Sequence, residues 1–436
     1  MSARAPAETI FALSSGRLPS GVAVVRLSGP ASTTALEALA GGIPTPRHAA
    51  FRALRDPGNG EVLDRALVLF FPGPRSVTGE DLAEFHLHGG RAVVAAVLGA
   101  LSRLPGLRPA EAGEFTRRAH GNGKMDLSEV EGLADLIAAE TQAQRRQALA
   151  QASGALSRRV EGWREKLLSA LALVEASIDF SDEGDVPEDL THQANGYIAP
   201  LLSEVEAALA DAGRGERVRD GLVVAIAGRP NAGKSTLLNR FAGREAAIVS
   251  DLPGTTRDVL EVHLELAGQA VTLLDTAGLR ETADRVEAEG VRRALARAEA
   301  ADLVLWLSPE GEEPPAALEN AIKLRSKCDE GQNAETDWIA LSALTGAGLE
   351  RLQERIEQEA SSLAGGEPAL ITRERQRLAL EAAVRHLALA SREFSGFEEL
   401  RAEELRLAAR ALDRTIGRVD VEDVLDTLFS TFCIGK

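Results

Sequence analysis

The stretch that most constrains this chain is GRPNAGKS, at residues 228–235. It matches the pattern G-x-x-x-x-G-K-[ST], in which two glycines allow a tight loop whose backbone N–H groups converge on phosphate oxygens. The apolar run LVVAIA precedes it at 222–227, and the amphipathic run TLLNRFAG follows it at 236–243. A strand, a loop and a helix are the context that this pattern requires, so we predict a phosphate-binding loop at a helix N-terminus.

Two side chains of this loop carry the predicted chemistry. Lys234 is placed to reach the outer phosphates of a nucleotide as a point charge and so to assist catalysis, and the Ser235 hydroxyl is placed to ligate Mg²⁺. An ordinary glycine-rich turn before a helix would leave this Lys-Ser pair unexplained. The predicted nucleotide contacts of the loop are therefore Asn231, Ala232, Gly233, Lys234, Ser235 and Thr236.

Length and composition limit the classes of protein to consider. A chain of 436 residues exceeds the roughly 250 to 300 at which single cores stop growing, so we expect three domains. No apolar run reaches the roughly 18 residues of a membrane span, and the N-terminus does not read as a secretion signal. A cytoplasmic protein is predicted, with Cys328 and Cys433 as reduced thiols because two cysteines so far apart give no disulfide framework.

The net charge of −17 argues against broad, non-specific binding to nucleic acid. Such binding comes mainly from Lys and Arg side chains that neutralise phosphates, so any contact with RNA must be local or shared with a partner. Basic residues do gather in three places, which we expect to be solvated helix faces. These clusters are Arg117, Arg118 and Lys124; Arg145 and Arg146; and Arg373, Arg375 and Arg377.

The order of patterns along the chain predicts a multidomain protein. Residues 1–120 alternate β-rich runs with turns and one helical stretch, which is typical of an α+β domain. Apolar residues three and four apart in Ala- and Leu-rich runs then predict packed helices over 121–218 and again over 368–436. Between them, strands alternate with helices at 219–367, which indicates an α/β P-loop domain inserted into the helical domain.

Two segments after the loop have the pattern of nucleotide switches. In the first, AIVSDLPGTTRDV (247–259), Thr256 is the candidate second ligand of Mg²⁺, with a plain surface turn as the alternative. The second segment, VTLLDTAG (271–278), is an apolar strand that ends in Asp-Thr-Ala-Gly. Asp275 can lie behind the Mg²⁺ shell, and the N–H of Gly278 can donate to the γ-phosphate. Leu279 stands where Ras-like enzymes carry a water-positioning Gln, so the catalytic group must come from elsewhere. The predicted contacts here are Ser250, Asp251, Leu252, Pro253, Gly254, Thr255, Thr256, Asp275, Thr276, Ala277 and Gly278.

The segment SKCD, at 326–329, stands where such proteins recognise the base. Asp329 can accept hydrogen bonds from guanine N1–H and the exocyclic amino group, a pair that adenine does not donate. Ser326 replaces the usual Asn, which we expect to weaken the contact that braces this loop. The later run LSALTGAGL offers backbone N–H groups to guanine O6. GTP is therefore the predicted nucleotide, with base contacts from Lys327, Asp329, Ser342, Ala343 and Leu344.

Together with other motifs, these residues resemble the MnmE (TrmE) family of bacterial and organellar GTPases, which modify the wobble uridine of tRNA. The resemblance covers nearly the whole chain. Its specific motifs are GVAVVRLSG, PRSVTGEDLAEFHLHGG, GEFTRRAHGNGKMDLSEVEGLADLI, the phosphate loop with its Asn231, GTTRD, DTAGLRET and the terminal CIGK. Generic GTPases lack the first three and the last, which makes the resemblance specific.

This resemblance implies an N-terminal domain similar to the tetrahydrofolate-binding fold of the glycine-cleavage T-protein. Such a domain dimerises and binds 5-formyltetrahydrofolate or a related folate. Matching motifs would give the folate contacts Arg26, Glu80, Lys124 and Lys436. The resemblance also implies a K⁺ ion beside the phosphates, with the ligands Asn231, Ser250, the backbone of Leu252, and Thr255.

The same resemblance implies the activity. Glu287 matches the carboxylate that orients the attacking water, and Cys433 either takes part in the chemistry or is a tail thiol without a role. A homodimer would hydrolyse GTP and, with an FAD-dependent partner of the MnmG (GidA) family, add a carboxymethylaminomethyl group at C5 of the wobble uridine. The alternative is a regulatory switch GTPase in ribosome assembly or signalling, which needs neither a folate pocket nor Cys433.

Overall fold

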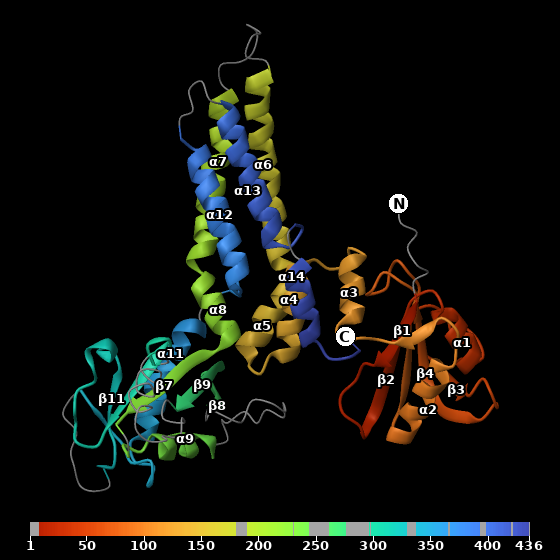
Figure 1. Ribbon diagram of the computed structural model, residues 1–436, viewed down its shortest axis with the longest axis horizontal. Helices are drawn as coiled ribbons and strands as arrows, with labels where there is room; N and C mark the ends of the chain where they lie inside the picture. The colour runs from red at the N-terminus through yellow and green to blue at the C-terminus, as the bar shows by residue number, and fades with distance from the viewer. Residues whose placement is uncertain are drawn as a thin grey trace, which may run out of the picture. The chain divides into compact units, whose positions relative to one another are not determined.

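The chain divides into two compact units in the computed structural model (Figure 1). The N-terminal unit contains Met1–Ala134 and Asp413–Lys436, and the central unit contains Asp135–Leu412. The structure describes residues 8–179, 190–229, 231–243, 261–275, 296, 298–328, 337–364, 367–392, 398–419 and 422–435.

The N-terminal unit is built on a six-stranded sheet with the order β3-β4-β5-β2-β1-β6. Neighbouring strands are antiparallel except β1 and β6, which are parallel. This sheet and its helices agree with the α+β pattern predicted for the region. The strands are β1 (Thr9–Leu13), β2 (Ser20–Ser28), β3 (Ala50–Arg55), β4 (Val62–Phe71), β5 (Leu82–Gly89) and β6 (Leu107–Pro109).

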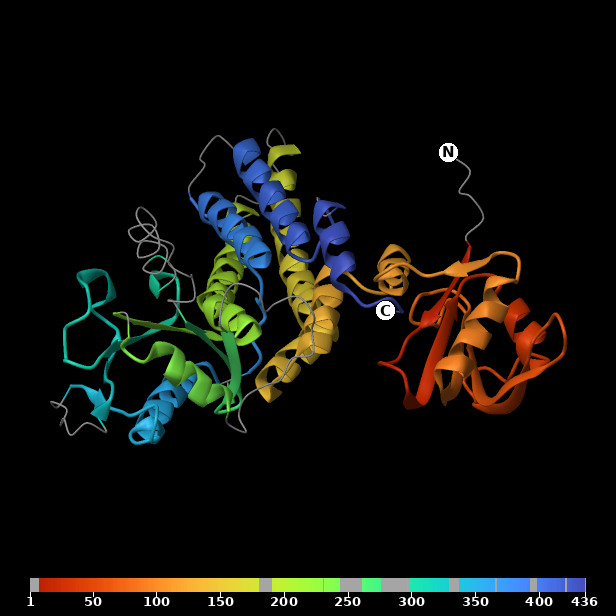
Figure 2. The same cartoon turned by 60° about the horizontal axis from the view of Figure 1, so that its bottom comes forward.

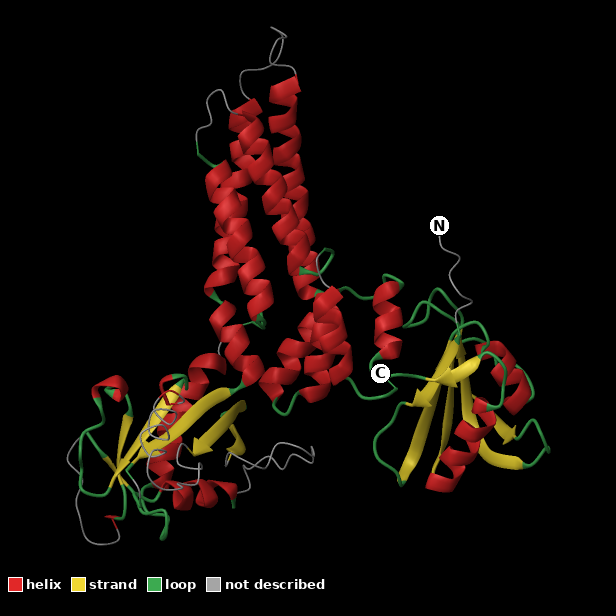
Figure 3. Cartoon of the chain, in the orientation of Figure 1, coloured by secondary structure: helices red, strands yellow, loops and turns green. Residues whose placement is uncertain are grey.

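The two faces of this sheet have different chemistry. Successive side chains of a strand point to opposite faces, so Val25 and Leu27 of β2 lie with Phe85 of β5 in a buried core under α1 and α2. Arg26 and Glu84, which pair across β2 and β5, lie on the opposite face. Figure 3 shows α1 and α2 against the strands of this sheet. The helices of this unit are α1 (Ser32–Ala40), α2 (Arg91–Ser102), α3 (Glu114–Gly121), α4 (Leu127–Ala138) and α14 (Glu422–Thr431).

The C-terminal tail packs against the first part of this unit. Ala112, just before α3, forms a bridge with Ile434, and the Ser14 hydroxyl donates to the Gly435 carbonyl at 2.8 Å. Gly435 has φ +101°, and a Cβ there would lie 2.2 Å from the carbonyl oxygen of Leu13. Only glycine fits this approach. The C-terminal tail is therefore held beside β1.

The central unit contains a second six-stranded sheet, with the order β12-β11-β10-β7-β9-β8. All pairs are parallel except β8 with β9, and the buried core includes residues of α9 and α11. A buried, parallel strand explains the continuous apolar run of β7. The elements are β7 (Leu222–Gly228), α9 (Lys234–Ala242), β8 (Glu261–Leu266), β9 (Gln269–Asp275), β10 (Leu303–Ser308), η1 (Ala316–Leu318), β11 (Ile322–Arg325), β12 (Ile339–Ala340) and α11 (Leu349–Ala364).

Long helices form the rest of the central unit. Figures 1 and 2 both show α6, α7, α12 and α13 side by side. Two of these precede the sheet in sequence and two follow it, as expected for an inserted α/β domain. The predicted limits 1–120, 121–218, 219–367 and 368–436 stay predictions. The helices are α5 (Gln142–Ala152), α6 (Ala155–Asp179), α7 (Leu190–Ala210), α8 (Ala212–Asp220), α12 (Glu374–Ala390) and α13 (Glu398–Thr415).

The helix α5 holds both connections between these helices and the sheet. The Gln147 amide donates to the carbonyl of Gly215 in α8, at 2.9 Å, and the Gln151 amide donates to the carbonyl of Ala369, at 3.2 Å. Residue 215 lies just before β7, and residue 369 follows α11. Among the described residues, no helix is long and apolar enough to cross a membrane.

Candidate functional site

The phosphate loop connects β7 to α9 at the carboxyl edge of the second sheet. Gly228 has φ +149°, and a Cβ there would lie 2.4 Å from the carbonyl oxygen of Leu307 in β10. Asn231 and Gly233 also have positive φ, 63° and 98°. The strand β7 lies between β9 and β10, where the strand order reverses, and ligands of open parallel sheets bind at such points.

Lys234, the first residue of α9, places its charge within this loop. Its side chain is buried, and Nζ donates to the carbonyls of Gly228 and Arg229, both at 2.8 Å. The first N–H groups of a helix have no partner within the helix, and the helix dipole adds positive potential there. The loop therefore offers converging donors and a positive charge to phosphate, as the sequence predicted.

Ser235 and Asp275 are brought together from separate elements. The Ser235 hydroxyl donates to Asp275 Oδ2 at 2.7 Å, and Asp275 is only 2% exposed at the end of β9. The pairing of Ile226 with Asp275 aligns β7 and β9 so that both strands end beside the loop. Hydroxyl and carboxylate oxygens suit Mg²⁺, so these residues fit the predicted metal, one as ligand and one behind it.

The two segments predicted to read guanine are neighbours at the same edge of the sheet. The Cys328 N–H donates to the Leu341 carbonyl at 3.2 Å, which joins the end of SKC to the start of LSALTGAGL. Ser326 is buried, and its Oγ has no hydrogen-bond partner within the described part of the chain. Ser342 is also buried, whereas Leu344 and Lys327 are exposed.

Several predicted site residues lie outside the described residues, so their positions stay predictions. Asp329 belongs to the base-reading segment, Glu287 is the predicted water-orienting carboxylate, and Lys436 is the predicted folate contact of the tail. The others outside the described residues are Ser250, Asp251, Leu252, Pro253, Gly254, Thr255, Thr256, Thr276, Ala277 and Gly278.

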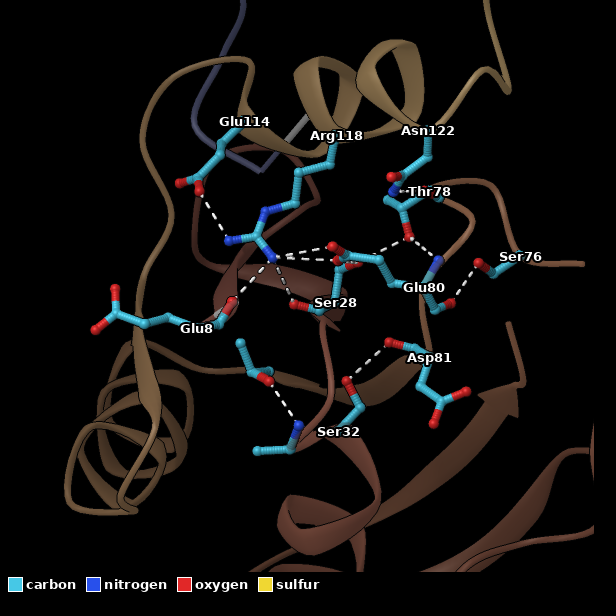
Figure 4. A network of polar contacts seen from close by, with 12 residues as sticks. Glu8, Ser28, Ser32, Ser76, Thr78, Glu80, Asp81, Glu114, Arg118 and Asn122 are labelled. Atoms are coloured by element: carbon cyan, nitrogen blue, oxygen red, sulfur yellow. Dashed lines mark hydrogen bonds and ion pairs between the residues drawn. The ribbon is translucent and has the colours of Figure 1, made fainter. Parts of the chain in front are cut away.

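In the N-terminal unit, Glu80 lies in a dense network of polar contacts (Figure 4). Its Oε2 accepts hydrogen bonds from the Ser28 hydroxyl at 2.7 Å and from Arg118 Nη1 at 3.1 Å. Thr78 is 2.7 Å from the same Ser28 hydroxyl, and its carbonyl accepts from Asn122 at 2.7 Å. The loop that carries Glu80 is thus tied to both β2 and α3.

Arg26 lies on the same face of β2 as Ser28, two residues away. It pairs with Glu84 of β5, with Nη2 2.9 Å from Oε1, and its guanidinium lies 5.9 Å from the centre of the Phe115 ring. The second oxygen of Glu84 lies 3.0 Å from His86 Nε2. Arg26 is therefore held in one orientation by strands β2 and β5 and by α3.

Lys124 packs against the residue before Glu80. A Cβ added at Gly79 would lie 3.3 Å from the Lys124 side-chain stem, and Lys124 Nζ donates to the Pro74 carbonyl at 3.0 Å. The structure thus brings together three of the four predicted folate contacts, from segments about 50 residues apart in sequence. They are Arg26, Glu80 and Lys124.

A buried acidic residue, Glu114, anchors one side of this network. Burial acts to raise the pKa of Glu114, but hydrogen bonds from Arg108, the Glu111 N–H and Arg118 together hold the pKa below its ordinary value. The hydrogen bond to Glu114 is the main reason that the pKa of Arg108 is raised. Glu114 is therefore a charged anchor point.

The sequence motifs do not single out Glu84 and Glu114, and they predict the wrong environment for Arg118. The Arg118 side chain is only 15% exposed and pairs with two carboxylates, so the prediction of a solvated helix face is wrong there. It is also wrong for Arg373, which is 21% exposed and pairs with Asp135 at 2.6 Å. A signal was present: Glu114 and Arg118 are four residues apart, the spacing of an ion pair on one helix face.

Cys433 is an exposed free thiol of the tail. It stands between Phe432, which packs with Phe429 and α4, and Ile434, which bridges to Ala112. Phe115 lies three residues after Ala112, and its ring contacts Arg26. The tail is therefore attached to the same part of the unit as the predicted folate contacts, although the role of Cys433 stays a prediction.

Two known family models together match nearly the whole chain. Residues 9–124 match the N-terminus of the GTP-binding protein TrmE, and residues 127–433 match the MnmE helical domain. The tRNA modification GTPase MnmE of Azorhizobium caulinodans is 68% identical over 430 residues, which cover 98% of this chain and 99% of that protein. This chain belongs to the MnmE family.

Other MnmE proteins match over similar lengths. That of Methylorubrum populi is 57% identical and covers 98% of each chain, and that of Beijerinckia indica is 55% identical and covers 100% of this chain and 98% of its own. The G domain of the T. maritima FeoB iron transporter, a solved structure, covers 33% of this chain and 99% of its own, at 26% identity. Its TM-score of 0.24 is too low to bear on the fold. Membership of the MnmE family confirms the resemblance and the multidomain fold class predicted from the motifs.

Proposed function

We propose that this chain is a GTP-hydrolysing enzyme of tRNA modification. The observation that carries the proposal is the joining of two features in one chain. Lys234, Ser235 and Asp275 lie together at the edge of a mostly parallel sheet, where they would bind phosphate and Mg²⁺, and the chain is 68% identical to a tRNA modification GTPase over nearly its whole length. Its nucleotide would be GTP, and its substrate would be tRNA.

Within the nucleotide site, each described residue has a role that its chemistry allows. The N–H groups at the start of α9 and the Lys234 ammonium would bind the phosphates, and the Ser235 hydroxyl and Asp275 would hold Mg²⁺, which supplies charge neutralisation. Asn231, exposed in the loop, offers a neutral oxygen that suits K⁺. Asp329 would select guanine, and Glu287 would orient water in place of the Gln that Leu279 replaces.

The N-terminal unit would bind 5-formyltetrahydrofolate or a related folate. Arg26, Glu80 and Lys124 lie on neighbouring segments, and each is held by a hydrogen bond to another segment, which is the preorganisation that a binding site needs. The folate would carry the one-carbon unit of the modification. Lys436 and Cys433 of the tail are the further residues proposed for this chemistry.

The complete reaction would need partners. We propose a homodimer in the cytoplasm that acts with an FAD-dependent protein of the MnmG (GidA) family to add a carboxymethylaminomethyl group at C5 of the wobble uridine. A purely regulatory GTPase is the weaker proposal, because it gives no reason for the ordered contacts around Glu80 and Arg26. The net charge of −17 is also consistent with RNA binding that is shared with a partner.

Nucleoside analysis of tRNA tests this function. A strain that lacks the gene should lose the modified wobble uridine, the unmodified chain should restore it, and Lys234→Ala should not. Arg26→Ala, Glu80→Gln and Lys124→Ala should bind folate much more weakly and lose modification while they still hydrolyse GTP. Cys433→Ser should also hydrolyse GTP. Wobble nucleosides that do not change in the deletion strain would exclude tRNA modification and favour the regulatory switch.

A further inference from the structure

Arg118 of α3 connects two carboxylates that come from different parts of the N-terminal unit. Its Nη1 donates to Glu80 Oε2 at 3.1 Å, and its Nη2 donates to Glu114 Oε1 at 3.0 Å (Figure 4). Nη1 also donates to the Glu8 carbonyl at 2.9 Å. Because the guanidinium is planar and its side chain is 15% exposed, these contacts leave it one orientation.

The far end of this connection is itself fixed. Arg108 donates to both oxygens of Glu114, at 2.8 and 2.6 Å, and the Glu111 N–H donates to Glu114 Oε2 at 2.9 Å. Arg108 also pairs with Glu8 at 2.8 Å. Glu114 is therefore a rigid support for Arg118, and its own position does not depend on Glu80.

The two oxygens of Glu80 have different surroundings. Oε2 accepts hydrogen bonds from Ser28 and Arg118 at normal distances, whereas the contact of Oε1 with Arg118 Nη1 is long, at 3.4 Å. The Glu80 side chain is 21% exposed. One oxygen is thus fixed by the protein, and the other keeps capacity to accept a hydrogen bond from a ligand.

We propose that Arg118 is a positioning residue of the folate site and acts through Glu80. The inference rests on the proposed function. A folate has a flat pteridine ring with N–H and amino donors at one end and carboxylates at the other. The Glu80 carboxylate would repel the carboxylate end of the folate, so Glu80 accepts hydrogen bonds from the donors of the pteridine ring. Arg118 holds its carboxylate in the orientation that this ring requires.

The test is the affinity of the full chain for 5-formyltetrahydrofolate, measured by titration calorimetry. Arg118→Gln should weaken binding about 10- to 100-fold, the usual effect of losing a hydrogen bond to a charged group. Arg118→Lys, which keeps one charged donor, should recover part of the loss. The matched control is Arg103→Gln, because Arg103 pairs with Asp56 in the same unit and this ion pair includes neither Glu80 nor Glu114, and it should bind nearly as tightly as the unmodified chain.

A double variant separates positioning from a general structural role. Without the Glu80 carboxylate, Arg118 has nothing to position, so adding Arg118→Gln to Glu80→Gln should cause no further loss of affinity. The inference would be overturned if Arg118→Gln lowered the affinity of the Glu80→Gln variant by the same factor as that of the unmodified chain. It would also be overturned if Arg118→Gln alone bound the folate as tightly as the unmodified chain. If Arg118→Gln unfolds on heating at a lower temperature than the control, the affinity of Arg118→Lys is the deciding measurement. Full affinity in Arg118→Lys would show that the guanidinium does not orient Glu80 and would overturn the inference. No binding by the unmodified chain would instead remove the folate proposal itself, and this inference with it.

Discussion

The nucleotide site and the proposed folate face, the surface around Arg26, Glu80 and Lys124, are built in opposite ways. The phosphate loop takes Gly228, Asn231, Gly233 and Lys234 from eight consecutive residues, and the backbone does much of the binding. The face around Glu80 takes side chains from β2, β5, α3 and the loop between β4 and β5. A site made of adjacent residues depends mostly on local geometry, whereas a site made of distant residues depends on the whole sheet register.

This difference predicts how far the effect of a substitution will spread to neighbouring contacts. In the phosphate loop, a change removes one contact with the ligand and leaves the others in place. On the folate face, most polar groups also bind one another, so a change at one residue frees its neighbours. We expect effects at the nucleotide site to be large and separable, and effects on the folate face to be coupled.

The largest expected effect is on base selectivity. Asp329→Asn should lower the preference for GTP by roughly 10⁴, because a site built to hydrogen-bond a substrate rejects the base that lacks the pairing. Xanthosine triphosphate, whose ring offers an acceptor there, should become the better ligand. Competitive binding of the two nucleotides to purified protein measures this change. Binding of ATP as tightly as GTP by the unmodified chain would show that the 326–329 segment does not read the base.

The next largest effect concerns potassium. Removing one preorganised electrostatic group costs roughly 10² to 10³ in rate, so GTP turnover should be faster by that order in potassium than in sodium at equal ionic strength. Asn231→Ala should remove most of the difference while GTP still binds through Lys234. Glu287→Ala should slow hydrolysis in both salts, because it acts on the water. Equal turnover by the unmodified chain in the two salts would contradict the potassium site.

A third change tests whether the phosphate loop also depends on the distant strand β10. Gly228→Ala places a methyl group against the Leu307 carbonyl and strains φ, so the central unit should lose about 1 to 3 kcal/mol of stability. GTP affinity should fall with it. Gly243→Ala is the matched control, since its Cβ would meet only ordinary contacts at 3.7 Å or more. Tryptophan fluorescence during urea unfolding reports this unit, which contains Trp306.

The smallest effect is a dependence of stability on pH in the N-terminal unit. The pKa of Glu114 is lowered in the folded state, so its contribution to stability is present above its ordinary value of 4.5. It is lost as the pH falls through the folded-state pKa. Glu114→Gln should therefore lose less stability than the unmodified chain between about pH 5 and that lower value.

Hydrogen exchange of the β1 and β2 amides suits this measurement, because the three tryptophans lie in the other unit. Glu37→Gln, at an exposed position of α1, is the control and should keep the slope of the unmodified chain. An unchanged slope in Glu114→Gln would show that Glu114 is not the group that couples stability to pH.

The sequence predicted the phosphate loop, its strand and helix, and the place of Asp275, because each depends on a motif or on a run of apolar residues. It did not predict that Arg118 meets Glu80 or that Glu84 meets Arg26, since an ion pair between distant segments leaves no periodic pattern. Arg118 reads as one more basic residue of a polar helix until α3 is placed beside β2. The family resemblance supplied Arg26, Glu80 and Lys124, but not the residues that hold them.

What the sequence determined by itself was local: the turn of the loop at Gly228 and Gly233, the strand and helix on either side, and the family to which the motifs belong. Only the tertiary structure decided which distant charges meet. The register of β2 against β5 puts Arg26 opposite Glu84, and the packing of α3 brings Arg118 to Glu80. The physical reason is that backbone geometry follows from neighbouring residues, whereas the partner of a charged side chain follows from how separate elements pack.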